Sequence, residues 1–263
     1  MKAAPSPMPV LVPTRRSLLP LVAGLLLPLL LLPVHAAQAQ ALAERCESRS
    51  PAVPVTVTSM PVGYTLDTSM PHREIAKLAG PAKTGTYVLG LTKARFNTRI
   101  TYRATLLHDR VNQQECLLPT LSVTLSYPSM VVYIGREFED GTCSYRQILM
   151  HELRHVQAFQ QQMTELETTV RQAMTARFST PIYAPLGQSL AQLSQEVNTV
   201  WKPYILAEQR KVETLQRQVD SPEESRRVVR SCGGELRKTI LASRNAPTAL
   251  PADSKETNDA DAP

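Results

Sequence analysis

A five-residue motif, His151-Glu152-Leu153-Arg154-His155, sets the strongest constraint on how this chain can fold. Its two histidines can share one metal ion only if residues 151–155 are helical, because side chains four residues apart then lie on one face. Two imidazole nitrogens at about 2.0–2.1 Å from the ion make half of a tetrahedral zinc site. Glu152 would lie beside the open position, where a carboxylate can accept a proton from a water molecule on the ion. The motif therefore predicts a helix that carries a hydrolytic metal site.

The residues around the motif predict that helix. A strand pattern at 130–134 and a turn at 139–142 come first, and Ser144 with Gln147 forms a capping-box start. A mostly apolar stripe then recurs at helical spacing, through Ile148, His151, His155, Phe159, Gln162, Leu166, Val170 and Ala173. The histidines are thus expected on the stripe that faces the protein. The alternative is a pair of core histidines satisfied by their neighbours, with Glu152 in an incidental salt bridge.

The first 41 residues are typical of a secretory signal peptide. Lys2, Arg15 and Arg16 precede an apolar run from Leu18 to Val34, and small-residue cleavage sites follow. A retained membrane anchor is the alternative, but three prolines interrupt the run. The arginine pair also leaves twin-arginine export open. We therefore expect a periplasmic or secreted protein with no integral membrane span after removal of the signal.

Four cysteines, Cys46, Cys116, Cys143 and Cys232, follow the signal. An even count in an exported chain predicts two disulfides, and three pairings are possible. We favour Cys116–Cys143, which would bracket the strand pair before the helix, and Cys46–Cys232, which would join the two ends. None of the four belongs to a CxxC pair, which argues against a cysteine-ligated zinc site.

The formal net charge of +6 is unevenly distributed. The signal carries three positive charges and the tail from Asn245 carries a net −3, so the part between them is again +6. A basic surface suits anionic partners such as cell-wall polymer or membrane headgroups, and a merely soluble basic surface is the alternative. The chain has one Trp, four Phe and no arginine-rich stretch, so we expect no nucleic-acid binding.

The chain after the signal divides into two regions that form one combined domain. Residues 42–140 predict a small, largely antiparallel β-rich region. Residues 141–244 predict a long helical hairpin, whose first helix runs from Ser144 to about Arg177 and carries the motif. Its second helix runs from Ser189 to about Val219, with a kink at Pro203. Residues 245–263 read as a disordered acidic tail, and the fold class is α+β.

The motif resembles that of the zincin metallopeptidase group. More narrowly, residues 61–178 resemble a family of predicted secreted bacterial zinc-dependent proteases. The shared layout is a β-rich lead-in, Cys116, the strand 130–134, and Cys143 shortly before the motif. The resemblance implies that His151 and His155 bind Zn²⁺ and that Glu152 is the general base.

A third zinc ligand must come from elsewhere in the chain. No histidine follows the motif, so an aspartate or glutamate is the natural substitute. If the two helices are antiparallel, the level of the histidines corresponds to residues 206–218. Glu208 falls in register with the apolar stripe of the second helix, and Glu213 lies about 140° away around it. We expect Glu208 to be the ligand, with Glu213 as the alternative.

Two functions remain open from the sequence. The first is an exported zinc hydrolase, a peptidase that acts on peptide or cell-wall bonds, with Tyr204 or Arg154 as possible oxyanion donors. The second is a disulfide-stapled envelope binding protein with a structural or vestigial metal site, which the long helices and the charged Arg154 favour. The sequence does not indicate the substrate or the oligomeric state.

Overall fold

The computed structural model describes residues 34–80 and 87–245. Most of the expected signal peptide, and the expected acidic tail after Asn245, lie outside these residues. Helix α1 (Val34–Glu47) runs through the expected cleavage sites. The sheet and its small flanking helix consist of β1 (Val55–Ser59), β2 (Thr65–Asp67), α2 (His72–Ala79), β3 (Gly90–Asp109), β4 (Gln114–Ile134) and β5 (Ile182–Pro185). The other helices are α3 (Cys143–Phe178), α4 (Ser189–Glu196), the π-helix η1 (Val197–Trp201), α5 (Lys202–Gln209), α6 (Val212–Val219), α7 (Pro222–Arg230), the 3-10 helix η2 (Cys232–Gly234) and α8 (Glu235–Asn245).

The protein combines helices with one mixed sheet that is built around β4. β3 pairs antiparallel with β4 along almost its whole length, from Gly90 opposite Ile134 to Asp109 opposite Gln114. On the other edge of β4, β5 pairs antiparallel, whereas β1 and β2 pair parallel with it. The parallel pairs were not indicated by the strand patterns. The strand expected at 130–134 is the end of the much longer β4, in which Pro128 and Ser129 lie beside a register shift between Arg95 and Asn97.

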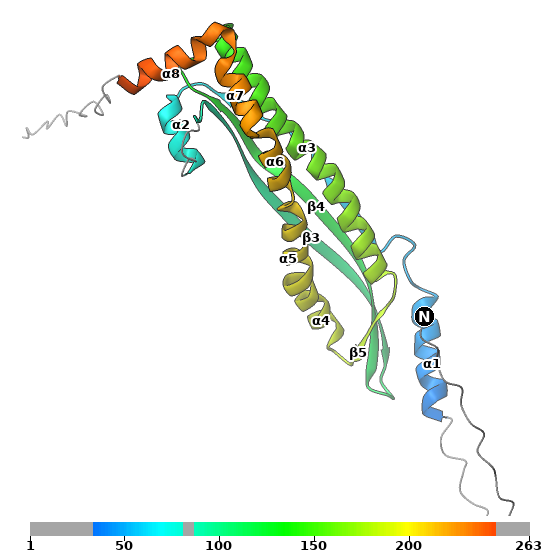
Figure 1. Cartoon of the computed structure of the whole chain (residues 1–263). Coiled ribbons are helices and arrows are strands. Elements are labelled where there is room, and N and C mark those ends of the chain that lie inside the picture. Colours follow the sequence, from blue (N-terminus) through cyan, green and yellow to red (C-terminus); the bar gives the residue numbers. More distant parts are fainter. Residues whose placement is uncertain (1–33, 81–86, 246–263) are drawn as a thin grey trace, which may run out of the picture.

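Helix α3 lies along one face of this sheet (Figure 1). It begins one residue before the expected start, and its N-cap is Thr142, whose hydroxyl accepts a hydrogen bond from Tyr145 N at 3.2 Å. The expected cap, Ser144, is instead buried. A helix of this length spans about 54 Å, which is enough to follow most of β4.

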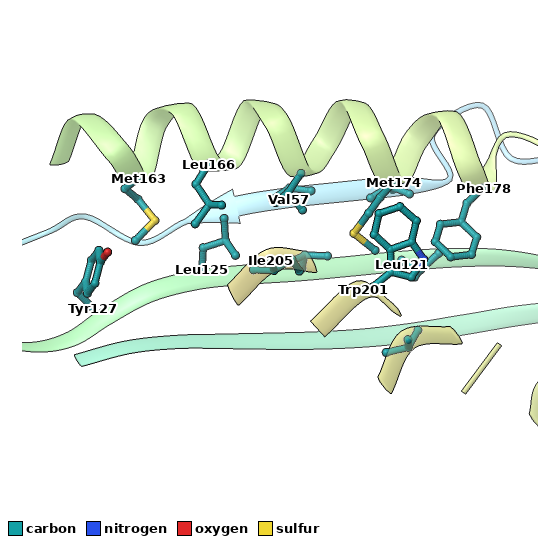
Figure 2. Close-up of a cluster of buried hydrophobic side chains, with 14 of the residues drawn as sticks. Val57, Leu121, Leu125, Tyr127, Met163, Leu166, Met174, Phe178, Trp201 and Ile205 are labelled. Carbon is teal, nitrogen blue, oxygen red and sulfur yellow. The ribbon is translucent and has the colours of Figure 1, made fainter. Parts of the chain in front are cut away.

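The main core lies between α3, the sheet and the chain that returns beside α3. Figure 2 shows side chains from these three sources in one layer, including Leu166 and Met174 from α3, Leu121 from β4 and Trp201 from η1. Leu121 and Met174 are fully buried. Apolar burial of this kind stabilises by about 25 cal/mol per Å².

The chain returns along α3 through short helices rather than one long second helix (Figure 1). Arg177 pairs with Glu196 at 2.8 Å, and the Gln162 amide donates to the Glu208 carbonyl at 3.0 Å. The expected kink at Pro203 takes the form of the π-helix η1 just before it. Proline has no N–H to donate, which accounts for an irregular turn at this place.

The start of α7 agrees with the sequence pattern. Ser221 is its N-cap and accepts a hydrogen bond from Glu224 N at 3.2 Å, with Pro222 as the first helical residue. Val228 of α7 then joins Ile148 of α3 and Leu236 of α8 in a second core cluster. In the described ranges 34–80 and 87–245, no helix is both long enough and apolar enough to span a membrane.

The structure contains two disulfides, but both favoured pairings were wrong. The bonds join Cys46 to Cys116 and Cys143 to Cys232. Cys116 lies near the start of β4 and Cys143 follows its end, and a strand rises about 3.3 Å per residue. The two cysteines are therefore at opposite ends of the sheet and cannot bridge. The first disulfide fixes α1 to β4, and the second fixes the α7–α8 junction to the start of α3.

Replacing Cys143 and Cys232 together by serine should lower the free energy of unfolding by about 2–5 kcal/mol. The bond closes a loop with a sequence separation of 89 residues, so its loss increases the entropy of the unfolded chain. Chemical denaturation checks this value. Peptide mapping without reduction should recover Cys46–Cys116 and Cys143–Cys232, and recovery of either other pairing would contradict the topology.

Candidate metal centre

His151 and His155 lie on one face of α3 and point at each other. Their Nε2 atoms are 3.3 Å apart, and their rings are nearly perpendicular, with centroids 5.0 Å apart. Both side chains are mostly buried. The helix therefore brings the two nitrogens to a single point, as the four-residue spacing predicts.

The third group at this point is Asp220, which ends α6. Its Oδ1 lies 3.3 Å from His151 Nε2 and 3.1 Å from His155 Nε2. Asp220 is the C-cap of α6, and the chain turns there into α7. Its side chain is 60 % exposed, so the group opens to solvent on the side of Asp220.

These three atoms fit the donor set of a tetrahedral metal ion. Two imidazole nitrogens and one carboxylate oxygen lie within 4.8 Å of one another, and the separations above are 3.1–3.3 Å. In a tetrahedron with bonds of about 2.0–2.1 Å, neighbouring donors are about 3.3 Å apart. Three protein donors and one open position are the usual arrangement of a catalytic zinc site.

Gln216 of α6 fixes the ring of His155 from behind. Its side-chain nitrogen donates to the His155 carbonyl at 3.2 Å, so its oxygen faces His155 Nδ1, with which it forms a short hydrogen bond. A proton on Nδ1 satisfies this contact and leaves Nε2 with a free lone pair. That tautomer is the one that binds a metal, and hydrogen bonds of this kind orient metal ligands in general.

Glu224 of α7 holds the other side of the centre. Its carboxylate accepts hydrogen bonds from Arg154 and from Arg227, which lower the pKa of Glu224. Its Oε1 also lies 3.5 Å from His151 Nδ1, a buried atom with no hydrogen bond among the described residues. Arg154, the charged residue inside the motif, therefore fastens α7 to α3.

Glu152 points away from solvent, toward the sheet. It is 4 % exposed, and the Thr92 hydroxyl of β3 lies 2.9 Å from its Oε2 and 3.1 Å from its carbonyl oxygen. A β-carbon added to Gly90 would lie 2.7 Å from Glu152 Oε1. The missing side chain at the start of β3 therefore makes room for the buried carboxylate.

The charges of this group are strongly coupled. Burial raises the pKa of Glu152 above its ordinary value, although both histidines act in the opposite direction. Burial acts to raise the pKa of Asp220 too, but hydrogen bonds from the two histidines outweigh it and lower the pKa. His155 has a raised pKa despite its burial, because Asp220 and Glu152 favour its protonated form. A metal ion can supply the positive charge that these carboxylates otherwise draw from a proton.

A groove of about 670 Å³ opens between α3 and the α6–α7 turn, next to this centre. Ser221 and Glu224, the neighbours of the metal group, form part of its wall. The rest is mixed, with glutamines and arginines beside Leu215 and Val219. The groove meets the centre through Arg154, Ser221 and Glu224, whereas His151, His155 and Asp220 do not line it.

The structure does not bring Glu208 to the histidines. The Glu208 carboxylate pairs with Lys211 at 2.5 Å, and its carbonyl lies at the level of Gln162. Glu213, the alternative, is exposed and lies 4.0 Å from Arg217. Tyr204, one of the possible oxyanion donors, packs on Trp201 instead.

The register of the returning chain explains this difference. Helix α4 begins beyond the end of α3 and packs against β5, so residue 177 lies opposite 196. His155 lies 22 residues before Arg177, and residue 218 lies 22 residues after Glu196. This position is two residues from Gln216, the observed partner of His155. The expected range 206–218 does not allow for this overhang, and it ends two residues before Asp220.

Asp220, Gln216, Glu224, Thr92 and Gly90 were not identified from the sequence as parts of the site. Two signals could have found some of them. A glycine within a strand pattern marks a close approach, which is the case for Gly90. Asp220 directly precedes the recognised start of α7, where the chain must turn. Nothing in the spacing indicates Gln216 or Thr92.

Comparisons with known proteins returned no relative: no family model, no curated protein and no solved structure matches the chain. The resemblance to zincins is therefore carried by residues 151–155, and the arguments on function depend on the geometry of the site.

Gly90→Ala should destabilise the protein by about 1–3 kcal/mol, because the new methyl group overlaps both the buried Glu152 side chain and the backbone carbonyl of Tyr133. Gly63→Ala is the matched control, since nothing lies within 4 Å of a β-carbon there. That change should be neutral or slightly stabilising. Thermal and urea denaturation measure both, and equal effects would show that Gly90 is not a contact of Glu152.

Proposed function

We propose that this protein is an exported metal-dependent hydrolase, a peptidase of the zinc type, whose ligands are His151, His155 and Asp220. The single observation that carries the proposal is the convergence of His151 Nε2, His155 Nε2 and Asp220 Oδ1 beside a buried glutamate of the same helix. Two imidazole nitrogens and one carboxylate oxygen at these separations are a donor set that a divalent cation such as zinc can bind.

Each residue of the centre has a part in the proposed reaction. When bound, a zinc ion supplies a Lewis acid that lowers the pKa of water and polarises a carbonyl group. Glu152 accepts the proton of the attacking water and passes it to the leaving amine. Burial raises the pKa of Glu152, which makes the carboxylate a stronger base, and the Thr92 hydroxyl orients it. Gln216 accepts a hydrogen bond from Nδ1 of His155, which leaves Nε2 to bind the metal.

The groove beside Asp220 supports a polymeric substrate, either a peptide or the peptide part of a cell wall. It is open to solvent between α3 and the α6–α7 turn, and it offers both amide side chains and apolar contacts. Export rests on the N-terminal sequence pattern and agrees with the two disulfides, which persist in oxidising compartments.

A second function is favoured by one specific observation. Glu152 is held against β3 by Thr92, and Asp220 belongs to the turn that joins α6 to α7. A metal ion at this place would clamp that turn to α3, and Glu152 would then be a buried structural carboxylate. The protein would in that case be a disulfide-stapled binding protein with a structural metal.

The proposed ligands can be tested one by one. His155→Ala and Asp220→Ala should each weaken zinc binding by more than about 100-fold, since each removes a donor atom. Glu208→Ala and Glu213→Ala are controls with the same loss of charge as Asp220→Ala, and they should bind zinc as the wild type does. Competition titration with a chromogenic chelator measures the affinities. Unchanged affinity in Asp220→Ala, or a large loss in Glu208→Ala, would contradict the ligand set.

Glu152→Gln should keep the metal and lose hydrolysis by at least about 100-fold, because the amide is nearly isosteric but cannot act as a base. Glu165→Gln, an exposed change on the same helix, is the control. A library of fluorogenic peptides and purified peptidoglycan provide the substrates. Retained activity would show that Glu152 is not the base. Loss of the metal in Glu152→Gln, with no hydrolysis by the wild type, would favour the structural clamp.

A further inference from the structure

Strand β3 carries a row of positive charges on the face of the sheet opposite to α3. Lys93, Arg95, Arg99 and Arg103 all occupy exposed positions of an alternating pattern. Because side chains alternate between the two faces of a strand, these four lie on one face. A rise of about 3.4 Å per residue spreads them over about 34 Å.

The residues between them point the other way, into the core. Phe96, Ile100, Tyr102 and Leu106 are half-buried and pack against the main hydrophobic cluster. The orientation of the charged row is therefore fixed by the burial of the apolar row. A one-residue slip of the strand would exchange the two faces and is excluded by this packing.

The charges of the row are not neutralised by neighbouring carboxylates. Within residues 34–80 and 87–245, none of the four side chains takes part in an ion pair. This sets them apart from Arg154, Arg171, Arg177 and Arg227, which all pair with glutamates. Four unpaired cations along one strand create a local positive potential.

Hydroxyl groups continue the same face across the sheet. Arg99 lies opposite Thr124 of β4, which in turn lies opposite Thr58 of β1. Further along β3, Arg103 lies opposite Thr120 of β4. The exposed positions of β1 and of this part of β4 are Thr56, Thr58, Thr120 and Ser122. Small polar side chains of this kind leave the face flat and supply hydrogen-bond donors beside the guanidinium groups.

The middle of this face is not covered by the described helices. Helices α1 and α2 contact β3 near opposite ends of the sheet, and α3 lies on the other face (Figure 1). On the opposite face of the sheet, the apolar side chains of the described residues are buried in the core under α3. A ligand on the charged face therefore meets guanidinium and hydroxyl groups.

We propose that this face binds a linear anionic polysaccharide, laid along β3. Guanidinium groups form paired hydrogen bonds with carboxylates or phosphates, and the threonine hydroxyls can bond to sugar hydroxyls. The row is long and one side chain wide, which fits a chain of repeated charges better than a single anion. This surface lies across the sheet from the metal centre, so the inference does not depend on the proposed hydrolase activity.

The shape of the row favours a polymer over the two other large anions. A strand of 20 residues twists along its length, so its charges cannot all meet a planar bilayer, whereas a flexible chain can follow them. Single-stranded nucleic acid needs exposed aromatic rings for stacking, and Phe96 and Tyr102 of this strand face the core.

Cations on an edge strand also have a purely protective role, because they discourage pairing with another copy of the chain. That role predicts self-association when they are removed, with no ligand. It does not account for the hydroxyls of β1 and β4, which lie away from the free edge of β3.

The experiment uses the full chain after signal removal and polygalacturonate as the probe. The triple variant Arg95→Gln, Arg99→Gln, Arg103→Gln should bind the polymer at least about tenfold more weakly at low salt. The control changes Lys202, Arg210 and Arg217 to Gln, three exposed cations of the returning helices, and removes the same net charge. It should bind as the wild type does. Isothermal titration calorimetry measures both, at two salt concentrations.

The single variant Arg99→Gln keeps Lys93, Arg95 and Arg103 on β3, and these charges still discourage self-association. It therefore tests the proposal even if the triple variant self-associates. It should weaken binding about two- to threefold. No binding by the wild type, or equal weakening in the helix-face control, would overturn the proposal. Tighter arginine-dependent binding to vesicles with 30 mol% phosphatidylglycerol, or to an oligothymidylate, would overturn it in favour of a membrane or a nucleic acid.

Discussion

The burial of one face of α3 against the sheet determines the geometry of the whole centre. Residues advance by about 100° around an α-helix, so the face that buries Val156, Met163 and Val170 must also bury Glu152. His155 lies about 60° to one side of that face and His151 about 100°. The histidines therefore stand at the boundary of the core, where the returning chain can reach them. The burial of this one face of α3 therefore places the Glu152 carboxylate in the core and the two imidazoles at the edge of the core.

The register of the returning chain completes the arrangement. Contacts at Glu196, Glu208 and Gln216 follow α3 toward its N-terminus, and the Cys143–Cys232 bond fixes the far end. Asp220 is thus held between a hydrogen-bonded helix and a covalent link, although its own side chain is exposed. A metal ligand on a chain turn needs such support, since a displacement of about 1 Å is enough to spoil a site.

Local features were predictable from the sequence, whereas long-range register was not. The bounds of α3 agree within a residue or two, because a long apolar periodicity and a turn before it define a helix without tertiary information. The start of α7 has a local basis too, because Ser221 is its N-cap and Pro222 its first helical residue. The strand pattern at 130–134 did not reveal that β4 begins at Gln114, because Pro128 interrupts the pattern and only the irregular pairing beside it lets proline stay within one strand. The disulfides and Asp220 depend on which distant segments meet, and spacing alone does not contain that information.

The two faces of the sheet differ in their chemistry. One face is apolar and packs against α3, which carries His151 and His155, and the other carries unpaired cations beside hydroxyls. The central claim is that a single metal ion binds where the two histidines and Asp220 converge. Anomalous diffraction at the zinc edge, from crystals grown with zinc, tests it most directly. The account predicts one peak about 2.0–2.1 Å from His151 Nε2, His155 Nε2 and Asp220 Oδ1. No peak at this place, or a peak at Glu208 instead, would contradict it.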